Sequence, residues 1–139
     1  MAVMTKYVQV ASKGESDVID ITGRVQKCVE ETGLSRGVVT VFVSGSTGAV
    51  TTMEYEPGLV RDLPDMLERV APRDQVYAHQ ETWNDDNGHS HVKASLIGPS
   101  LVVPFVDGKL TLGAWQQIVF LELDIHPRSR RIVLQVTGE

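Results

Sequence analysis

A chain of 139 residues with a formal net charge of -5 is long enough to bury one hydrophobic core and too short for two. Its hydrophobic fraction of 42% and charged fraction of 22% are ordinary for a globular domain and exclude an intrinsically disordered chain. The negative charge argues against nucleic-acid binding, which depends on phosphate neutralisation by Lys and Arg. We expect one domain over residues 1–139 and no nucleic-acid partner.

The cysteine content and the N-terminus bear on the cellular compartment. Cys28 is the only cysteine and cannot form an intrachain disulfide, and the opening "MAVMTKYVQV" lacks the apolar run of a signal peptide. The most apolar segment, "LVVPFV", is far shorter than the roughly 20 residues of a membrane helix. The sequence predicts a cytoplasmic protein with no membrane span.

The first part of the chain alternates between strand and helix patterns. Residues 6–12 alternate apolar and polar side chains, which predicts a half-buried strand. Residues 23–32 repeat apolar side chains at helical spacing, with Thr22 as a candidate cap and Gly33 as a stop. Residues 37–44 are rich in β-branched side chains and apolar on both faces, which indicates a central strand deep in a sheet.

The middle of the chain predicts one strand and two helices. Residues 49–55 form the strand, and Pro57 fits the first turn of a helix that ends at "APRD". The apolar stripe of this helix consists of Leu59, Leu63, Met66, Leu67 and Val70. Residues 92–97 predict a short helix, capped at Asn87 or Ser90 and stopped by Gly98-Pro99.

The C-terminal part reads as β structure. Asp107-Gly108 lies between apolar runs and predicts a two-residue hairpin, and residues 115–124 and 131–139 predict two long strands separated by Pro127. Two or three helices among strands that are mostly adjacent in sequence give an α+β domain with a largely antiparallel sheet.

The segment "HQETWNDDNGHSH" holds three of the four histidines. Neutral imidazole is the commonest metal ligand, so His79, His89 and His91 are candidate ligands of a divalent metal, zinc or magnesium. If the short helix begins at or before His89, however, His89 and His91 lie about 200° apart around it. His79 and His91 would then remain, with Glu54 as the third donor. The alternative interpretation is that these histidines lie on a solvated loop and bind nothing.

Two further patterns bear on binding. In "SGSTGA" the small residues and the hydroxyls of Ser46 and Thr47 suit a phosphate or carboxylate, although turns between strands use the same residues. Candidates for the counter-charge are Arg128, Arg130 and Arg131; an ordinary surface arginine cluster is the alternative. Strand 115–124 is apolar on both faces yet carries Gln116 and Glu122, which indicates a cleft or a subunit interface and hints at oligomerisation.

Three segments, "GSTGAVTTMEYEPGL", "NDDNGHSHVKASLIGPSLVVPFVDGKLTLGAWQQIVFLELD" and "PRSRRIVLQVTGE", resemble the YjbQ family of small proteins labelled secondary thiamine-phosphate synthases. The resemblance covers nearly the whole chain. It implies an α+β domain with a β-sandwich-like core, a homotrimer, a histidine-bearing pocket for a metal or an anion, and a weak thiamine-phosphate synthase activity.

The family's polar positions fall on Glu54, His79, Asn87, His91, Trp115, Gln116, Glu122 and Arg128. Many members carry a His-Thr-Thr run where this chain has Gly45-Ser46-Thr47, so one histidine of the usual pocket is absent. His89 stands where many members have an acid.

The expected function is an enzyme acting on a small phosphorylated metabolite. Its expected catalytic residues are Glu54, His91 and Glu122, and its substrate- or anion-binding residues are Ser46, Thr47, Asn87, Gln116 and Arg128. A non-catalytic trimer that binds a metal or a phosphorylated metabolite is the alternative. In a third interpretation the histidines only stabilise a trimer interface.

Overall fold

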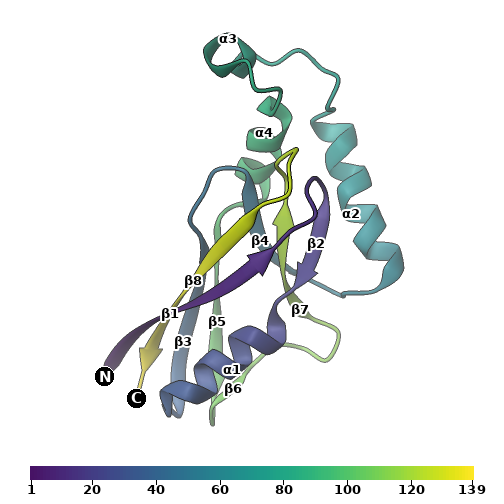
Figure 1. Cartoon of the computed structure of the whole chain (residues 1–139). Coiled ribbons are helices and arrows are strands. Elements are labelled where there is room, and N and C mark those ends of the chain that lie inside the picture. The colour runs from purple at the N-terminus through teal and green to yellow at the C-terminus, as the bar shows by residue number, and fades with distance from the viewer.

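The computed structural model of the protein describes residues 1–139 as one α+β domain with two antiparallel sheets and four helices (Figure 1). One sheet has five strands in the order β1-β8-β3-β5-β6, and the other has three in the order β2-β7-β4. The strands are β1 (Ala2–Ala11), β2 (Asp17–Asp20), β3 (Arg36–Val43), β4 (Gly48–Met53), β5 (Ser100–Val106), β6 (Lys109–Leu110), β7 (Gln117–Glu122) and β8 (Ser129–Gly138). The helices are α1 (Thr22–Thr32), α2 (Pro57–Val70), α3 (His79–Trp83) and α4 (Gly88–Ile97).

The centre of the fold is β7, which is buried on both faces. Ile118 and Phe120 contribute to the core that the inner face of the five-stranded sheet and α1 share with β7. Val119 and Leu121 contribute to a second cluster that includes Leu67 of α2. The three-stranded sheet is therefore the middle layer of the domain, between the larger sheet and the α2–α4 side.

This arrangement corrects one inference from the sequence. The apolar side chains on both faces of residues 115–124 predict a cleft or a subunit interface, because one core is expected to cover only one face of this strand. Two clusters of the same chain cover them instead, and Ile118 to Leu121 are each at most 1% exposed. Two-sided burial of β7 thus needs no partner subunit.

Several sequence predictions are confirmed. The strand expected at residues 37–44 is β3, the middle strand of the larger sheet. Gly33 ends α1 in the left-handed conformation with a φ of 72°. Asp107 and Gly108 both have positive φ, 53° and 73°, as a two-residue hairpin of mirror-image turn type requires. The short helix before Gly98 is also present, as α4.

Other predictions need correction. The pattern missed β2 and α3, so the domain has four helices where two or three were expected. Both elements are too short, at four and five residues, to show a period. Thr22 is not the cap of α1: it lies inside the helix, and its hydroxyl accepts a hydrogen bond from the Ile118 amide at 2.8 Å. Although β3 is central, Val38 and Phe42 on its outer face are 37% and 42% exposed.

None of the four helices combines the length and the apolar composition that crossing a bilayer requires.

Leu121→Ala should destabilise the protein by about 2–5 kcal/mol, because it leaves a cavity in the second cluster that rigid neighbours cannot fill. Urea denaturation followed by circular dichroism measures the change. Leu59→Ala on α2 is the matched control, since Leu59 is 37% exposed and its truncation should cost far less. Equal losses in the two variants would contradict the middle-layer position of β7.

Candidate functional site

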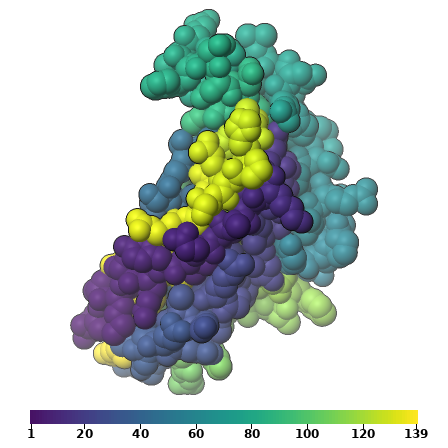
Figure 2. Space-filling view, in the orientation of Figure 1, coloured from purple at the N-terminus to yellow at the C-terminus, as the bar shows by residue number.

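Segments from four parts of the chain meet at one end of the sheets. They are the loop of residues 44–47 between β3 and β4, helix α3 with the turn that follows it, the first turns of α4, and the hairpin that joins β7 to β8. Figure 2 shows the start of β8 (yellow) on the surface beside β1 (purple), next to the helical end of the molecule. These segments bring most of the predicted site residues into one neighbourhood.

A small cavity of about 150 Å³ lies between the 44–47 loop and α4. Its lining consists of Gly45, Ser46, Gly48, His91, Ala94, Ser95 and Pro99. Ser46 and Gly45 are exposed, whereas Gly48 and Ala94 are buried. The cavity is therefore a recess in the surface with His91 in its wall.

His91 lies beside a second imidazole and a carboxylate. The ring centroids of His79 and His91 are 4.4 Å apart, and Asp85 Oδ1 lies 3.3 Å from His79 Nε2. Asn87 satisfies these neighbours when its amide nitrogen is oriented to donate to Asp85 at 2.8 Å, an assignment made from the hydrogen-bond network. The two histidines and Asp85 thus form one polar group at the start of α4.

Burial lowers the pKa of His91, and the neighbouring His79 lowers it further, while Asp85 and Asp124 act in the opposite direction. Desolvation disfavours the imidazolium form because the ring loses the water that would solvate its charge. His91 is therefore a neutral imidazole at neutral pH, with a nitrogen available to accept a proton or a hydrogen bond.

Asp124 lies behind this group and is 1% exposed. Burial by itself would raise the pKa of Asp124, but hydrogen bonds from the Ile125 amide and the Thr47 hydroxyl and the charge of Arg128 lower it overall. Thr47 donates to Asp124 Oδ2 at 3.0 Å, and Arg128 Nη2 donates to the same oxygen at 2.7 Å. The carboxylate thus fixes the 44–47 loop to the β7–β8 hairpin.

Glu122 forms a second buried anchor and is 0% exposed. Its carboxylate accepts from Ser12 Oγ at 2.7 Å, from Arg130 Nε at 2.9 Å and from the Asp124 amide at 3.2 Å. A buried carboxylate needs such partners because an unpaired charge in the interior is costly. The position of Glu122 fits a role in holding Arg130, since these partners occupy its oxygens.

His89 lies on another side of α4. The helix begins at Gly88, so the condition that separates His89 from His91 is met. His89 Nε2 is 2.7 Å from Glu15 Oε1, and the same carboxylate accepts from Arg73 at 2.8 Å. Lys93, 1% exposed, donates to Glu68 at 2.8 Å in the same cluster.

The three-histidine metal site expected from the sequence is not formed within this chain. His79 and His91 are together and His89 is not, and no group of three His, Cys, Asp or Glu side chains is arranged to hold a metal ion. The residues present therefore do not fit a metal held by His79, His89 and His91.

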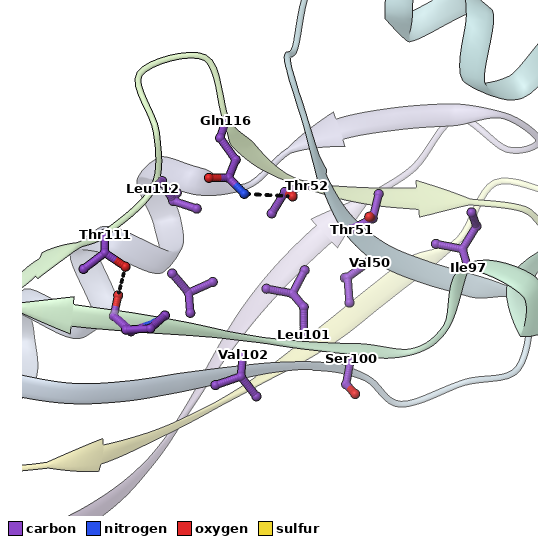
Figure 3. A pocket seen from close by; sticks show the side chains of 12 residues that line it. Val50, Thr51, Thr52, Ile97, Ser100, Leu101, Val102, Thr111, Leu112 and Gln116 are labelled. Carbon is purple, nitrogen blue, oxygen red and sulfur yellow. Dashed lines mark hydrogen bonds between the residues drawn. The ribbon is translucent and has the colours of Figure 1, made fainter.

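Two other predicted site residues lie toward the opposite end of β4. Glu54 directly follows the last residue of that strand and is exposed, away from Gly48 and the cavity. Gln116 lines a separate groove of about 320 Å³ between β4 and β5, where it donates to Thr52 Oγ1 at 3.1 Å (Figure 3). No charged side chain lines that groove, so Gln116 is not part of an anion site with Arg128.

Asp85 and Asp124 are not among the site residues expected from the sequence, whereas Arg130 is one of the three arginines considered as counter-charge. A signal for Asp124 is present in the sequence: Glu122 and Asp124 precede the Pro127 break at a spacing of two, and Arg128 and Arg130 follow it at the same spacing. A hairpin places such alternating charges opposite each other. Asp85, in contrast, had only the pattern of a turn residue.

Comparisons with known proteins agree with the fold. Residues 6–139 match the family described as UPF0047 protein YjbQ-like. A UPF0047 protein of Methanothermobacter thermautotrophicus is 39% identical over 139 residues, covering 100% of this chain and 95% of the relative. UPF0047 protein YugU of Bacillus subtilis is 31% identical, covering 97% of this chain and 100% of the relative.

Solved structures give the same result. A YbjQ-like protein of unknown function from Sulfolobus solfataricus superposes with a TM-score of 0.89 at 30% identity, covering 99% of this chain and 100% of that one. A hypothetical protein from Aeropyrum pernix gives a TM-score of 0.90 at 34% identity, covering 98% and 99%. The fold thus defines a YjbQ-like α+β protein. The chain belongs to the UPF0047 (YjbQ) family.

The lowered pKa of His91 predicts a stability that depends on pH. Between the pKa of His91 in the unfolded chain, near 6.5, and its lower pKa in the folded protein, the unfolded chain binds more protons than the folded one. The free energy of unfolding therefore has its full value above the unfolded pKa and decreases as the pH falls toward the folded pKa. Melting temperatures measured from pH 7.5 to 5 should fall less steeply in His91→Gln than in the unmodified protein. Identical slopes would show that His91 does not titrate as its burial requires.

Proposed function

We propose that the protein is an enzyme that acts on a small phosphorylated metabolite in the recess at the start of α4. The observation that carries the proposal is the neutral His91 imidazole in the wall of a cavity that it shares with Ser46 and the 44–47 loop. A neutral imidazole can take a proton from a reacting group, and general-base catalysis of this kind works best when the pKa of the base lies near the working pH.

The neighbours of His91 give it a defined setting. His79 and Asp85 form a polar group that can accept and return a proton next to it. Asp124 and Glu122 hold the loop and the hairpin in place through Thr47 and Arg130, so the pocket wall is fixed before a ligand enters. The hydroxyl of Ser46 makes no hydrogen bond within the chain and stays available to a ligand.

The family resemblance favours a thiamine-phosphate synthase-like transfer, in which a pyrimidine diphosphate is joined to a thiazole phosphate and pyrophosphate leaves. The thiazole nitrogen forms a bond to the pyrimidine methylene carbon as the C–O bond to pyrophosphate breaks, and no proton is released. In this transfer the neutral His91 would donate its ring N–H to the oxygens of the leaving pyrophosphate. No step of this proposal passes through a metal ion. Because phosphorylated intermediates are held inside the cell, we propose a cytoplasmic location.

A non-catalytic binding protein is the second candidate, and one observation favours it. The carboxylates and hydroxyls around the recess are mostly engaged with each other: Thr47 binds Asp124 and Arg130, and Arg130 binds Glu122. No serine, threonine or cysteine of the site is hydrogen-bonded to a histidine, as an activated nucleophile would be. Tight binding of a phosphorylated ligand without turnover would support this function.

We further propose that the protein self-associates through the outer face of the five-stranded sheet, as a homotrimer by family resemblance. This face exposes large apolar side chains on three strands, namely Val3, Tyr7, Val38, Phe42, Val102 and Val106. A patch of this kind on a small domain is typical of a protein–protein contact. The patch is separate from β7, whose faces are already covered.

His91→Gln should lower turnover by about 10²- to 10⁴-fold, the usual contribution of a general acid or base, without unfolding the protein. The assay is product formation from a phosphorylated pyrimidine and a thiazole phosphate, extended to a panel of other phosphorylated substrates. His126→Gln, at an exposed histidine, is the control and should retain activity. A folded His91→Gln variant with full activity would refute the catalytic role.

Metal content is measured independently of activity, by elemental analysis of the untagged protein and of His91→Gln. If the protein contains about one metal per chain and His91→Gln contains none, His79 and His91 must share the metal with a further ligand that is not His89. Absence from both preparations agrees with the metal-free role given to His91.

Val102→Asp should convert the oligomer to monomers, because it places a charge in the proposed interface at a residue that is 59% exposed in the single chain. Light scattering coupled to size-exclusion chromatography measures the mass. Val76→Asp, at a residue that is 93% exposed outside this sheet, is the matched control and should leave the mass unchanged. A monomeric unmodified protein would contradict the proposed assembly.

A further inference from the structure

The loop between β3 and β4 carries an uninterrupted run of free hydrogen-bond donors. The backbone N–H groups of Ser44, Gly45, Ser46 and Thr47 donate no hydrogen bond within the chain. Ser44, Gly45 and Ser46 are exposed, whereas Thr47 is buried, so the first three of these amides belong to the solvent-exposed part of the loop. Consecutive free amides in a glycine-containing loop are typical of anion-binding concavities.

A partly free guanidinium lies against the same loop. The Nε and Nη2 atoms of Arg130 bind Glu122 and Thr47, but Nη1 makes no hydrogen bond within the chain. Nη1 lies 3.0 Å from the position that a Cβ atom would take on Gly45. The Arg130 side chain is 11% exposed, so the loop and Glu122 hold it in one place.

The other candidates for anion contact are already engaged. The Thr47 hydroxyl donates a hydrogen bond to Asp124 Oδ2 and accepts one from Arg130 Nη2 at 2.9 Å. Arg128 donates to Asp124, and its side chain is 48% exposed and makes no hydrogen bond to the loop. Of the three arginines that the sequence offers for the counter-charge, Arg130 is therefore better placed than Arg128, which was the one expected to bind the anion.

We propose that the phosphate group of the ligand binds at the Gly45 side of the loop, to Arg130 Nη1, the Ser46 hydroxyl and the free loop amides. Arg130 and Gly45 are then the residues that determine phosphate recognition. Gly45 is required because a side chain there would occupy the space beside Nη1. Gly45 also lines the recess that contains His91, so a phosphate bound here keeps its substituent near that imidazole. This inference rests on the proposed function and names the binding subsite of the same pocket.

Phosphate suits these donors better than a carboxylate does. Its oxygens can accept from a guanidinium, a hydroxyl and several amides at once, and charge-assisted hydrogen bonds of this kind are the stronger class. The positive charge of Arg130 is balanced by Glu122, so recognition depends on donor geometry more than on net charge.

Titration with inorganic phosphate, followed by isothermal calorimetry and compared with acetate, tests the proposal. Gly45→Val should weaken phosphate binding roughly tenfold or more, because its side chain fills the space at Nη1. Its backbone conformation permits the substitution, since Gly45 is not among the glycines with positive φ. Gly23→Ala is the matched control, because a Cβ there meets nothing within 4 Å.

Two arginine variants separate the alternatives. Arg130→Lys keeps a cation beside Glu122 but removes Nη1, and should weaken phosphate binding as Gly45→Val does, whereas Arg128→Gln should not. Thermal unfolding verifies that each variant is folded; if Arg130→Lys unfolds, Gly45→Val decides alone. Loss of binding in Arg128→Gln only, unchanged binding in Gly45→Val, or no binding of phosphate by the unmodified protein at millimolar concentration would overturn the proposal.

His91→Gln distinguishes this proposal from the proposed function. A variant that binds phosphate normally but has lost turnover supports both. If it binds phosphate and keeps full turnover, the catalytic role of His91 fails while the phosphate subsite stands. If turnover depends on His91 but is unaffected by Gly45→Val, the catalytic role of His91 stands and the phosphate subsite fails.

Discussion

Burial of β7 on both faces is the constraint from which the rest of the structure follows. A strand of six residues with Ile118 and Phe120 on one side and Val119 and Leu121 on the other must be covered by two layers. The five-stranded sheet supplies one cover, and the α2–α4 side supplies the other (Figure 1). The central position of β7 also decides where its charged end emerges.

That charged end creates the polar site. Glu122 and Asp124 lie where the chain leaves the core, and both side chains are fully buried. Buried carboxylates must be paired and hydrogen-bonded. The hairpin after β7 returns Arg130 and Arg128 to them, and Thr47 connects both pairs to the loop after β3. The same network that satisfies the buried charges therefore fixes the loop, while the loop amides and Arg130 Nη1 stay free for a ligand.

Helix α4 gives neighbouring histidines different surroundings. His91 faces His79 and the recess, where burial keeps it neutral, and His89 faces Glu15 within a cluster of charged side chains that includes Lys93. The cause is the helical twist, since residues two apart point in nearly opposite directions. One helix thus has a side that lines the recess and a side that ties it to α2 and to the segment between β1 and β2.

The sequence by itself determined the α+β class, the central strand β3, the hairpin at Asp107-Gly108, the stop of α1 at Gly33 and the family. These features depend on local periodicity, on backbone conformations that particular residues favour, or on long motifs. It also placed His79, His91, Asn87, Ser46 and Thr47 in what proved to be one neighbourhood.

Only the tertiary structure decided which of the predicted residues meet. It separated His89, Glu54 and Gln116 from His91, added Asp85 and Asp124, and covered both faces of β7 within one chain. Side-chain neighbours across sheets depend on strand order. Strand order has no local signal, because the free energy that fixes it comes from packing between segments far apart in the sequence.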